Sequence, residues 1–171
     1  MPDDLRIFCG IGSNIDDRYQ NLNNGIEQLN EHAHIWVINT SYVYQSPPMY
    51  YTGQEEFYNM VVEIETNLNP LQLLNEVKKI EKIAGKDLKK KKNMPRILDI
   101  DILAVGDLLI RSKLLEIPHP KISERRFVLK PWNDIAPEFH VPSLDKDIAE
   151  LLQITDDTSS INRVLILDDK G

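Results

Sequence analysis

Asp99 and Asp101 are separated by a single residue in a stretch that predicts a β-strand. Side chains at i and i+2 of a strand project from the same face and lie about 7 Å apart. Two carboxylates at that separation can together hold a hard cation. Mg²⁺ commonly takes one or two carboxylates from a protein and completes its coordination with water and phosphate oxygens. The pair therefore predicts a magnesium site or, as the alternative, an exposed acidic strand face.

Basic residues gather immediately before this acidic pair. The chain carries 27 acidic residues against 20 basic ones, for a formal charge of −7, yet nine of the basic residues fall between Lys78 and Arg96. The overall charge argues against a surface that binds long nucleic acid, whereas the local cluster suits a small anionic ligand. A solvated lysine-rich loop is the alternative explanation. Carboxylates and cations together indicate phosphoryl-type transfer, which depends on positioning and charge neutralisation more than on a protein nucleophile.

Other polar residues could contact a phosphate. His119 lies between two prolines, where its ring could be held rigidly against a phosphate or could simply satisfy a turn. Arg125 and Arg126 are adjacent, so at most one of them projects into a site. Arg96 precedes Asp99 by three residues, which places a cation at the start of the same strand.

Asn59, Phe57 and Phe127 have the chemistry to bind a flat heterocycle. An asparagine amide donates and accepts hydrogen bonds at once, so Asn59 could read the edge of such a ring. The two phenylalanines could stack on its faces, although a single phenylalanine belongs to the core more often than to a ligand site. None of these positions decides the function alone.

Hydrophobic patterning predicts the elements that position these residues. The segment 57–66 alternates as a strand buried on one side, and 97–105 has apolar residues at its even positions, which directs Asp99 and Asp101 to the opposite face. In chain order we expect a strand at 5–10 that Gly12, Ser13 and Asn14 break, a helix, strands at 35–44 and 57–66, a helix from Asn69 and Pro70 to Gly85, and a strand at 97–105.

This β-α-β-β-α-β order is typical of a ferredoxin-like α/β sandwich, an α+β fold in which both helices cover one face of an antiparallel sheet. The other face would be free for a site, and Asp99 and Asp101 would point to it. Farther along, Ser123 predicts the cap of a short helix through Leu129. We also expect a short helix at 145–152 and a terminal strand or ordered tail at 164–167.

Length and composition limit the alternatives. The chain has 171 residues, of which 42% are hydrophobic, and we expect a single domain over 1–171. Its core would lie at about 5–142, with 143–171 as a solvated acidic extension. Cys9 is the only cysteine, which excludes an internal disulfide and a multi-cysteine metal site. Without a signal-peptide-like start or an apolar run that could span a membrane, the sequence predicts a cytoplasmic protein, and we expect a monomer.

The series of motifs is more specific than any one of them. Pro95, Arg96, Asp99 and Asp101 form a Pro-Arg-x-x-Asp-x-Asp block that is correctly spaced among other blocks over residues 5–142. On these residues the chain closely resembles the 6-hydroxymethyl-7,8-dihydropterin pyrophosphokinase family. The other matching blocks are Ile11-Gly12-Ser13-Asn14, Tyr44-Gln45-Ser46-Pro47-Pro48, Phe57-Tyr58-Asn59, Ile80-Glu81 with Gly85, Pro118-His119, Arg125-Arg126-Phe127-Val128-Leu129 and Ile135-Ala136-Pro137-Glu138.

The resemblance implies the ferredoxin-like fold and a reaction that moves the β- and γ-phosphates of ATP together onto the hydroxymethyl oxygen of the pterin, leaving AMP. It implies that Asp99 and Asp101 hold two Mg²⁺ ions that bridge the ATP phosphates. It further implies three groups of site residues: Asp101, Arg96 and Lys86 in catalysis; Glu81, Arg96, Ile102, Leu115, His119 and Arg125 at ATP; and Ser46, Pro47, Met49, Phe57, Asn59 and Phe127 at the pterin.

The chain departs from the family pattern at several positions. Lys86 stands where the family often has arginine, which keeps the charge but loses the planar guanidinium, and Leu88, Asn93 and Met94 also differ. Phe57 stands where other members have tyrosine. Except for Phe57, these positions fall in a lid-like loop, so they concern closure more than the type of reaction. Two other functions stay open: a magnesium-dependent nucleotidyl transferase that releases pyrophosphate, and a catalytically silent binding module on the same fold.

Overall fold

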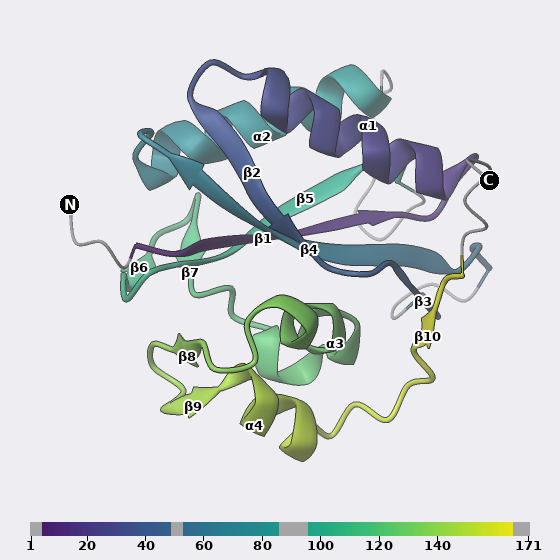
Figure 1. Ribbon diagram of the computed structural model, residues 1–171, viewed down its shortest axis with the longest axis vertical. Helices are drawn as coiled ribbons and strands as arrows, with labels where there is room; N and C mark the ends of the chain where they lie inside the picture. The colour runs from purple at the N-terminus through teal and green to yellow at the C-terminus, as the bar shows by residue number, and fades with distance from the viewer. Residues whose placement is uncertain (1–4, 49–52, 86–95, 166–171) are drawn as a thin grey trace.

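The computed structural model describes residues 5–48, 53–85 and 96–165, which form an antiparallel sheet with helices on both faces (Figure 1). The strands of this sheet are β1 (Ile7–Ser13), β2 (Ile35–Thr40), β3 (Tyr44–Ser46), β4 (Phe57–Thr66), β5 (Asp99–Val105) and β10 (Asn162–Arg163). Their order is β10-β3-β4-β1-β5, and β2 pairs with the central strand β4. The strands that carry Asn59 and Asp99 therefore flank β1.

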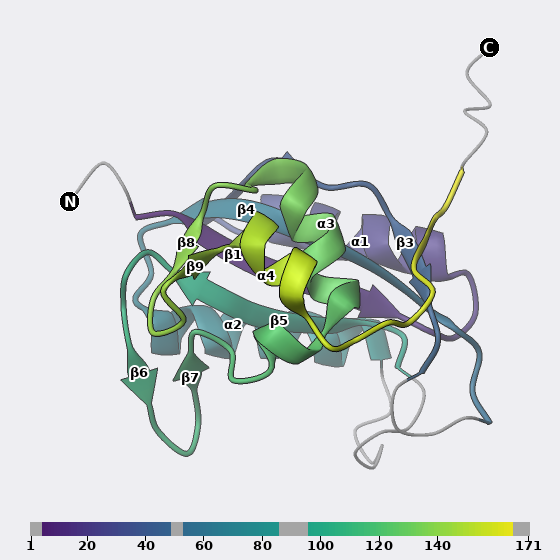
Figure 2. The same cartoon turned by 90° about the horizontal axis from the view of Figure 1, so that it is seen from below.

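The helices form one layer on each face of the sheet (Figures 1 and 2). α1 (Arg18–Glu31) and α2 (Pro70–Gly85) cover one face, whereas α3 (Arg126–Ile135) and α4 (Ile148–Ile154) lie on the other. The predicted α+β, ferredoxin-like fold is confirmed, with both of its core helices on one face. The opposite face is only partly free, because α3 packs against β4. The remaining short elements are β6 (Ile110–Arg111), β7 (Glu116–Ile117), the 3₁₀ helix η1 (Ile122–Glu124), β8 (His140–Val141) and β9 (Lys146–Asp147).

The sheet separates two buried clusters of side chains. Met60 and Val62 of β4 pack in the cluster beneath α1 and α2, and Val61 packs in the second cluster with Trp132 of α3. Residues 60–64 of β4 are all buried, so the prediction of a strand buried on one side only is wrong. The residues around α3 supply the second layer, which the alternation within β4 alone does not reveal.

Capping side chains begin both core helices, and the start predicted for α2 at Asn69 and Pro70 is confirmed. The Asp17 side chain accepts a hydrogen bond from the backbone nitrogen of Gln20 at 3.1 Å in the first turn of α1. At the start of α2, Asn69 and Gln72 exchange hydrogen bonds, each from a backbone nitrogen to the other residue's side-chain oxygen, at 2.9 Å. These reciprocal bonds satisfy donors that the first helical turn leaves without partners.

Two predicted strand boundaries are wrong. β1 continues through Gly12 to Ser13 because both residues stay paired with β4. The single strand expected at 35–44 is two strands, β2 and β3, with Ser41 between them. The Ser41 hydroxyl oxygen accepts a hydrogen bond from the Val61 backbone nitrogen at 2.9 Å. A side chain thereby takes the place of a main-chain acceptor, and the ladder is interrupted there.

β5 contains a bulge that changes the direction of its side chains. Phe8 pairs with Ala104, and the next residue of β1, Cys9, pairs with Ile102, which leaves Leu103 as the extra residue. Ile102 belongs to the cluster beneath α1 and α2, whereas Ala104 belongs to the second cluster. The expectation that all even positions of this strand share one core face is therefore wrong beyond the bulge.

The segment after β7 also differs from its prediction. Ser123 lies within η1 and does not cap a helix through Leu129, because α3 runs from Arg126 to Ile135. The helix expected at 145–152 is found as α4, and its Ile148 and Leu151 are buried in the second cluster. The prediction of a solvated extension is wrong for α4, because these apolar residues join the core.

The strand β10 lies at one edge of the sheet. β10 adds to the edge of β3, two residues before the expected terminal strand.

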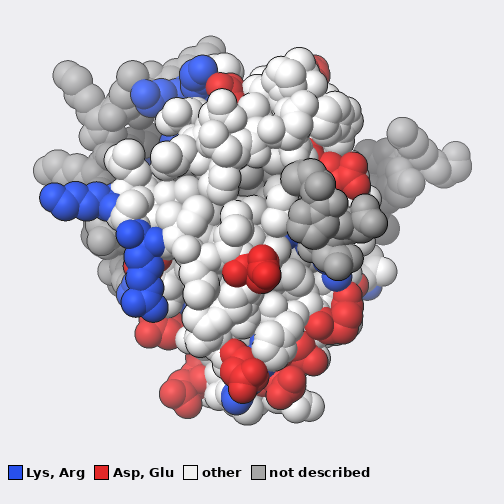
Figure 3. Space-filling model, turned by 90° about the vertical axis from the view of Figure 1, so that its left-hand side faces the viewer, with Lys and Arg blue, Asp and Glu red and all other residues white. Residues whose placement is uncertain are grey.

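On the face shown in Figure 3, acidic side chains gather over the lower part, where α4 and β9 lie in Figure 1. Basic side chains lie toward one margin of that face. Charges of both signs are therefore unevenly distributed over this face.

Candidate active site

A row of paired residues crosses the sheet at the candidate site. Gly12 of β1 lies opposite Asn59 of β4 on one side and opposite Asp99 of β5 on the other. In the same way, Gly10 lies between Val61 and Asp101. Directly paired residues of an antiparallel sheet project from the same face, and adjacent strands are about 4.8 Å apart. Asn59 and Asp99 therefore stand about 10 Å apart across a position that has no side chain.

The lack of a side chain at Gly12 lets the side chains of Asn59 and Phe57 lie close to β1. A Cβ atom at this position would lie 2.7 Å from Oδ1 of Asn59 and 3.6 Å from Cδ1 of Phe57. The Asn59 amide has little freedom to move away, because its Nδ2 donates a hydrogen bond of 2.8 Å to Oγ of Ser46. Ser46 is only 2% exposed, and Pro47 follows it directly. Four of the predicted pterin residues, Ser46, Pro47, Phe57 and Asn59, are thus brought together.

Asp99 and Asp101 are partly buried, and charges of both signs act on their carboxyl groups. Burial raises the pKa of Asp99 to about 6, and the neighbouring charge of Asp101 adds to the effect. Burial likewise raises the pKa of Asp101. The positive charges of Lys78, Arg96 and Arg125 act on both carboxyl groups in the opposite direction. A cation bound between the two aspartates would therefore relieve their mutual repulsion.

The donor set fits a hard divalent cation. Over 5–48, 53–85 and 96–165 there is no group of three or more histidine, cysteine or acidic residues that could hold a metal. Two carboxylates are the number that Mg²⁺ commonly takes from a protein when a nucleotide supplies further oxygens. Asp99 and Asp101 are therefore the residues that would hold it.

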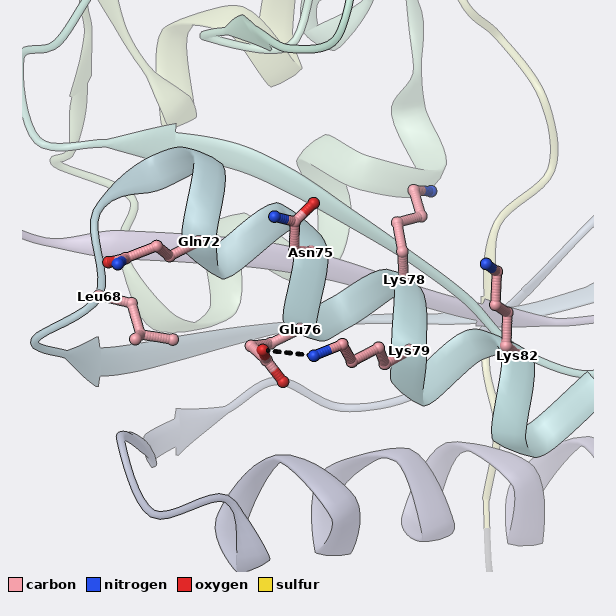
Figure 4. Close-up of a pocket in the computed structure, with 7 residues that line it drawn as sticks. All are labelled: Leu68, Gln72, Asn75, Glu76, Lys78, Lys79 and Lys82. Carbon is pink, nitrogen blue, oxygen red and sulfur yellow. Dashed lines mark hydrogen bonds and ion pairs between the residues drawn. The ribbon is translucent and has the colours of Figure 1, made fainter.

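Glu81 and Lys78 of α2 complete the edge of the site next to β5. Oε1 of Glu81 accepts a hydrogen bond of 2.7 Å from the backbone nitrogen of Ile100, and Lys78 Nζ lies 3.2 Å from Oε2 of Glu81. In Figure 4 the Lys78 side chain is directed away from the Glu76–Lys79 pair on the same helix. Lys78 is absent from the predicted site residues. Its position three residues before Glu81, on the same helical face, is the signal that could have revealed it.

Asn14 joins Arg96 to the loop that precedes β4. Oδ1 of Asn14 accepts a hydrogen bond of 2.7 Å from the Arg96 backbone nitrogen, and the Asn14 backbone nitrogen donates to the Arg96 carbonyl oxygen at 3.0 Å. Its Nδ2 donates to Oε1 of Gln54 at 2.6 Å. Asn14 is 1% exposed. This residue, also absent from the predicted site residues, anchors the segment that enters β5.

We expect Asn14→Ala to lower kcat/KM about 10-fold for the diphosphate transfer that the sequence predicts. The reason is that Arg96 and the segment before β4 lose a shared anchor. Unpaired buried backbone groups should also lower the free energy of unfolding by about 1–3 kcal/mol. Steady-state kinetics and thermal unfolding measure the two effects. Asn24→Ala is the control, since Asn24 is exposed on α1 and accepts a hydrogen bond from Gln20 of the same helix. Unchanged kinetics in Asn14→Ala would contradict the anchoring role.

His119 and Arg125 approach from the segment between β7 and α3. The His119 backbone nitrogen donates to the carbonyl oxygen of Leu103, the bulged residue of β5, at 2.9 Å. Its Nδ1 accepts a hydrogen bond of 3.2 Å from the Lys121 backbone nitrogen. Burial, together with the positive charge of Arg125, lowers the pKa of His119 to about 4. The ring is therefore neutral at pH 7 with its proton on Nε2, which can donate to a phosphate oxygen.

The two adjacent arginines diverge. Arg126 donates from Nη1 to the Ser159 carbonyl oxygen at 2.9 Å, so its side chain joins the C-terminal segment. The Arg125 guanidinium lies 5.6 Å from the ring centroid of Phe127 and acts electrostatically on Asp99. Of the pair, Arg125 is therefore the one that the structure brings to the aspartates, and Phe127 lies beside it.

The remaining predicted site residues are placed differently or not described. The side chains of Ile102 and Leu115 are buried in the cluster beneath α1 and α2, at 4% and 7% exposure. Ile102 therefore faces away from Asp101, its neighbour in β5. Met49 and Lys86 lie outside the described residues, as do Leu88, Asn93 and Met94.

The raised pKa of Asp99 makes ligand-free stability depend on pH. A carboxyl group whose pKa rises from 3.8 to about 6 on folding favours the folded state when protonated. This contribution is fully present below pH 3.8 and is lost as the pH rises through about 6. We therefore expect the advantage in Tm of Asp99→Asn over the wild type to grow by about 2–5 °C between pH 5 and pH 7. Thermal unfolding without nucleotide or metal measures this difference in Tm. Asp107→Asn, at an exposed position, is the control. A Tm difference between Asp99→Asn and the wild type that does not change with pH would contradict the prediction.

Comparisons with known proteins bear on this arrangement. The family model described as "7,8-dihydro-6-hydroxymethylpterin-pyrophosphokinase (HPPK)" matches residues 8–137. The chain belongs to this family. The match includes β1, β4 and β5 and every described residue of the site. The matched stretch thus contains Asn59, Asp99 and Asp101.

The proteins similar to this chain include some that it nearly spans and some that are much longer. A 2-amino-4-hydroxy-6-hydroxymethyldihydropteridine pyrophosphokinase of Aquifex aeolicus is 38% identical over 144 residues, which is 84% of this chain and 88% of the relative. That of Methylorubrum extorquens is 35% identical over 93% of this chain and 98% of the relative. The folic acid synthesis protein FOL1 of Dictyostelium discoideum is 41% identical over 81% of this chain. The chain spans only 20% of the FOL1 protein.

Solved structures show the same fold. The HPPK-DHPS of Plasmodium falciparum with pteroate superposes with a TM-score of 0.70 at 20% sequence identity, over 87% of this chain and 42% of that one. Among the residues that the structure describes, no helix is long and apolar enough to cross a membrane.

Proposed function

We propose that this HPPK-family chain transfers diphosphate from ATP to the hydroxymethyl group of 6-hydroxymethyl-7,8-dihydropterin and releases AMP, a step of folate synthesis. The observation that carries the proposal is the row Asn59–Gly12–Asp99 across three paired strands. In this row Asn59 would read the heterocycle and Asp99 would hold a metal, and the residue between them has no side chain. The match to the Aquifex aeolicus pyrophosphokinase, over 84% of this chain and 88% of that protein, supports it.

The proposed pterin site lies beside Gly12, next to Asn59 and Phe57. Asn59 would pair with the edge of the ring, and its amide orientation is set by the bond to Ser46. Phe57 and Phe127 would enclose the two faces of the ring. Pro47 and Met49 would line the same pocket. Two aromatic rings around one oriented amide would suit a heteroaromatic ligand.

The proposed ATP site lies on the side of Asp99 and Asp101. Two Mg²⁺ ions bound by these carboxylates would neutralise the phosphates and make the substrate hydroxyl more acidic. Arg96 and Arg125 would contact phosphate oxygens, as would Lys86 from its loop. His119 would donate from Nε2, because its Nδ1 is engaged by Lys121. Glu81 would lie near the nucleoside, and Ile102 and Leu115 would contribute only main-chain atoms there, because their side chains are buried in the core.

The reaction would proceed by attack of the pterin hydroxyl oxygen on the β-phosphorus of ATP. A new O–Pβ bond forms, the bond between Pβ and the oxygen bridging to Pα breaks, and AMP leaves with that oxygen. The hydroxyl proton departs to a nearby acceptor, for which Asp101 is the closest candidate among the proposed residues. Positioning of the two substrates by the opposed walls supplies much of the rate enhancement.

The test is an incubation of the purified chain with ATP, Mg²⁺ and 6-hydroxymethyl-7,8-dihydropterin, with the nucleotide products separated by chromatography. We expect AMP and a pterin diphosphate in equal amounts, and no AMP when the pterin is omitted. Release of pyrophosphate would instead identify a nucleotidyl transferase. Binding of the pterin without turnover would identify a silent binding module. The monomeric state and cytoplasmic location expected from the sequence remain proposals, which gel filtration and cell fractionation would test.

A further inference from the structure

α3 begins beside the active site without a capping side chain of its own. Arg125 occupies the N-cap position and makes no side-chain cap hydrogen bond. Arg125 and Phe127 are proposed contacts of ATP and the pterin, and both project from this first turn. The direction of the turn therefore sets the position of both side chains. Its backbone N–H groups need acceptors from elsewhere in the molecule.

Asp157, 31 residues farther along the chain, supplies such an acceptor. Its Oδ2 accepts a hydrogen bond of 2.8 Å from the backbone nitrogen of Arg126, the first residue of α3. Its Oδ1 accepts hydrogen bonds from the Ser159 backbone nitrogen, at 2.9 Å, and from the Ser159 hydroxyl group. The carboxylate is therefore oriented through both oxygens. Its negative charge is also favourable at the N-terminus of a helix.

The segment that carries Asp157, residues 155–165, forms a C-terminal strap between the two sides of the site (Figure 1). Oγ1 of Thr155 donates to the Ser123 carbonyl oxygen at 2.8 Å, and Arg126 donates to the Ser159 carbonyl oxygen at 2.9 Å. Beyond these contacts, β10 pairs with β3, which ends at Ser46 of the proposed pterin pocket. The C-terminal strap thus joins the start of α3 to the opposite wall of that pocket.

We propose that Asp157 is a positioning residue for the transfer reaction, acting as a remote cap that holds Arg125 and Phe127 of α3 in the orientation that the two substrates need. The inference rests on the proposed function of the site. Asp157 itself does not touch the substrates; it acts through the backbone of Arg126. A mutation at Asp157 should therefore change substrate binding more than it changes overall stability.

The chain provides a matched control at the neighbouring position. Asp156 is exposed, carries the same charge, and makes none of the hydrogen bonds described for Asp157. A change at Asp156 alters the net charge of the C-terminal strap by the same amount. Asp157→Ala and Asp156→Ala therefore differ in that only the first removes the cap of α3.

The experiment compares Asp157→Ala, Asp157→Asn and Asp156→Ala in the full chain, well below their unfolding temperatures. For Asp157→Ala we expect KM for ATP and for the pterin to rise about 5- to 10-fold. In Asp157→Asn the amide oxygen can still accept from Arg126, so the rise should be about 2-fold. Asp156→Ala should match the wild type. Hydrogen exchange over 122–130, measured without substrates, should accelerate about 10-fold in Asp157→Ala alone.

A lower Tm with unchanged KM and unchanged exchange at 122–130 would overturn the inference, as would equal effects in Asp156→Ala. If Asp157→Ala does not fold, Ser159→Ala replaces it, because it removes only one donor to Oδ1 and should raise both KM values about 2-fold. A wild-type chain that produces no AMP would refute the proposed function. The cap would then be judged by hydrogen exchange alone, and unchanged exchange at 122–130 would refute it separately.

Discussion

Replacing either Asp99 or Asp101 by asparagine should abolish diphosphate transfer while making the ligand-free protein more stable. The loss of activity should be about 10³-fold or more, because the amide carries no charge to hold a divalent cation against the ATP phosphates. The gain in stability follows from the raised pKa values, since burial and the neighbouring carboxylate both oppose ionisation at neutral pH. AMP formation and thermal unfolding measure the two effects.

The expected loss of activity and gain in Tm distinguish a metal-binding role of the aspartates from a structural one. A structural role for the aspartates would couple lost activity to a lower Tm, whereas a metal-binding role couples it to a Tm higher by about 2–6 °C. Asp107→Asn, in the exposed turn after β5, should leave both properties unchanged. Activity within about 10-fold of the wild type in both single variants would contradict the assignment of these residues as the metal ligands.

Gly12→Ala should raise KM for the pterin by about 10- to 100-fold while ATP binding changes little. The added methyl group would lie 2.7 Å from Oδ1 of Asn59, whose amide is tied to Ser46. It would therefore displace the Asn59 amide, the group proposed to read the pterin. Titration with the pterin and with a non-hydrolysable ATP analogue separates the two effects, and retained ATP binding shows that the variant is folded.

Gly10→Ala is the matched comparison on the same strand. A Cβ atom at Gly10 would lie 3.6 Å from Cδ2 of Leu103, which is ordinary van der Waals contact. We expect its effect on pterin affinity to be less than about 5-fold. Equal pterin affinity in Gly12→Ala and the wild type would show that the ring binds elsewhere.

Predictions that depended on local periodicity were confirmed where the strand or helix stayed regular. Alternation within β5 placed Asp99 and Asp101 together, because strand side chains have a period of two residues whatever their neighbours are. The start of α2 at Pro70 was confirmed, because Asn69 acts within a few residues. The same reasoning failed at Leu103, where pairing with β1 inserts a bulge that β5 alone does not encode visibly.

Contacts between distant segments escaped prediction for a different reason. Asn14 lies 82 residues from Arg96 and Asp157 lies 31 residues from Arg126, and no spacing rule connects either pair. The spacing of Lys78 to Glu81 is visible in the sequence, but only the packing of α2 against β5 brings Lys78 to the aspartates. Even Ile102 and Leu115, which the family resemblance assigns to the nucleotide, prove to be core side chains. Such relations depend on how whole elements pack.

By itself, the sequence determined the fold class, the paired aspartates on one strand face and the family, because periodicity and ordered motifs are properties of the chain. The tertiary structure alone decided that Gly12 lies between Asn59 and Asp99, that α3 covers part of the second face, and that Asp157 caps this helix. Each of these depends on strand register or on long-range packing, which many distant residues set together.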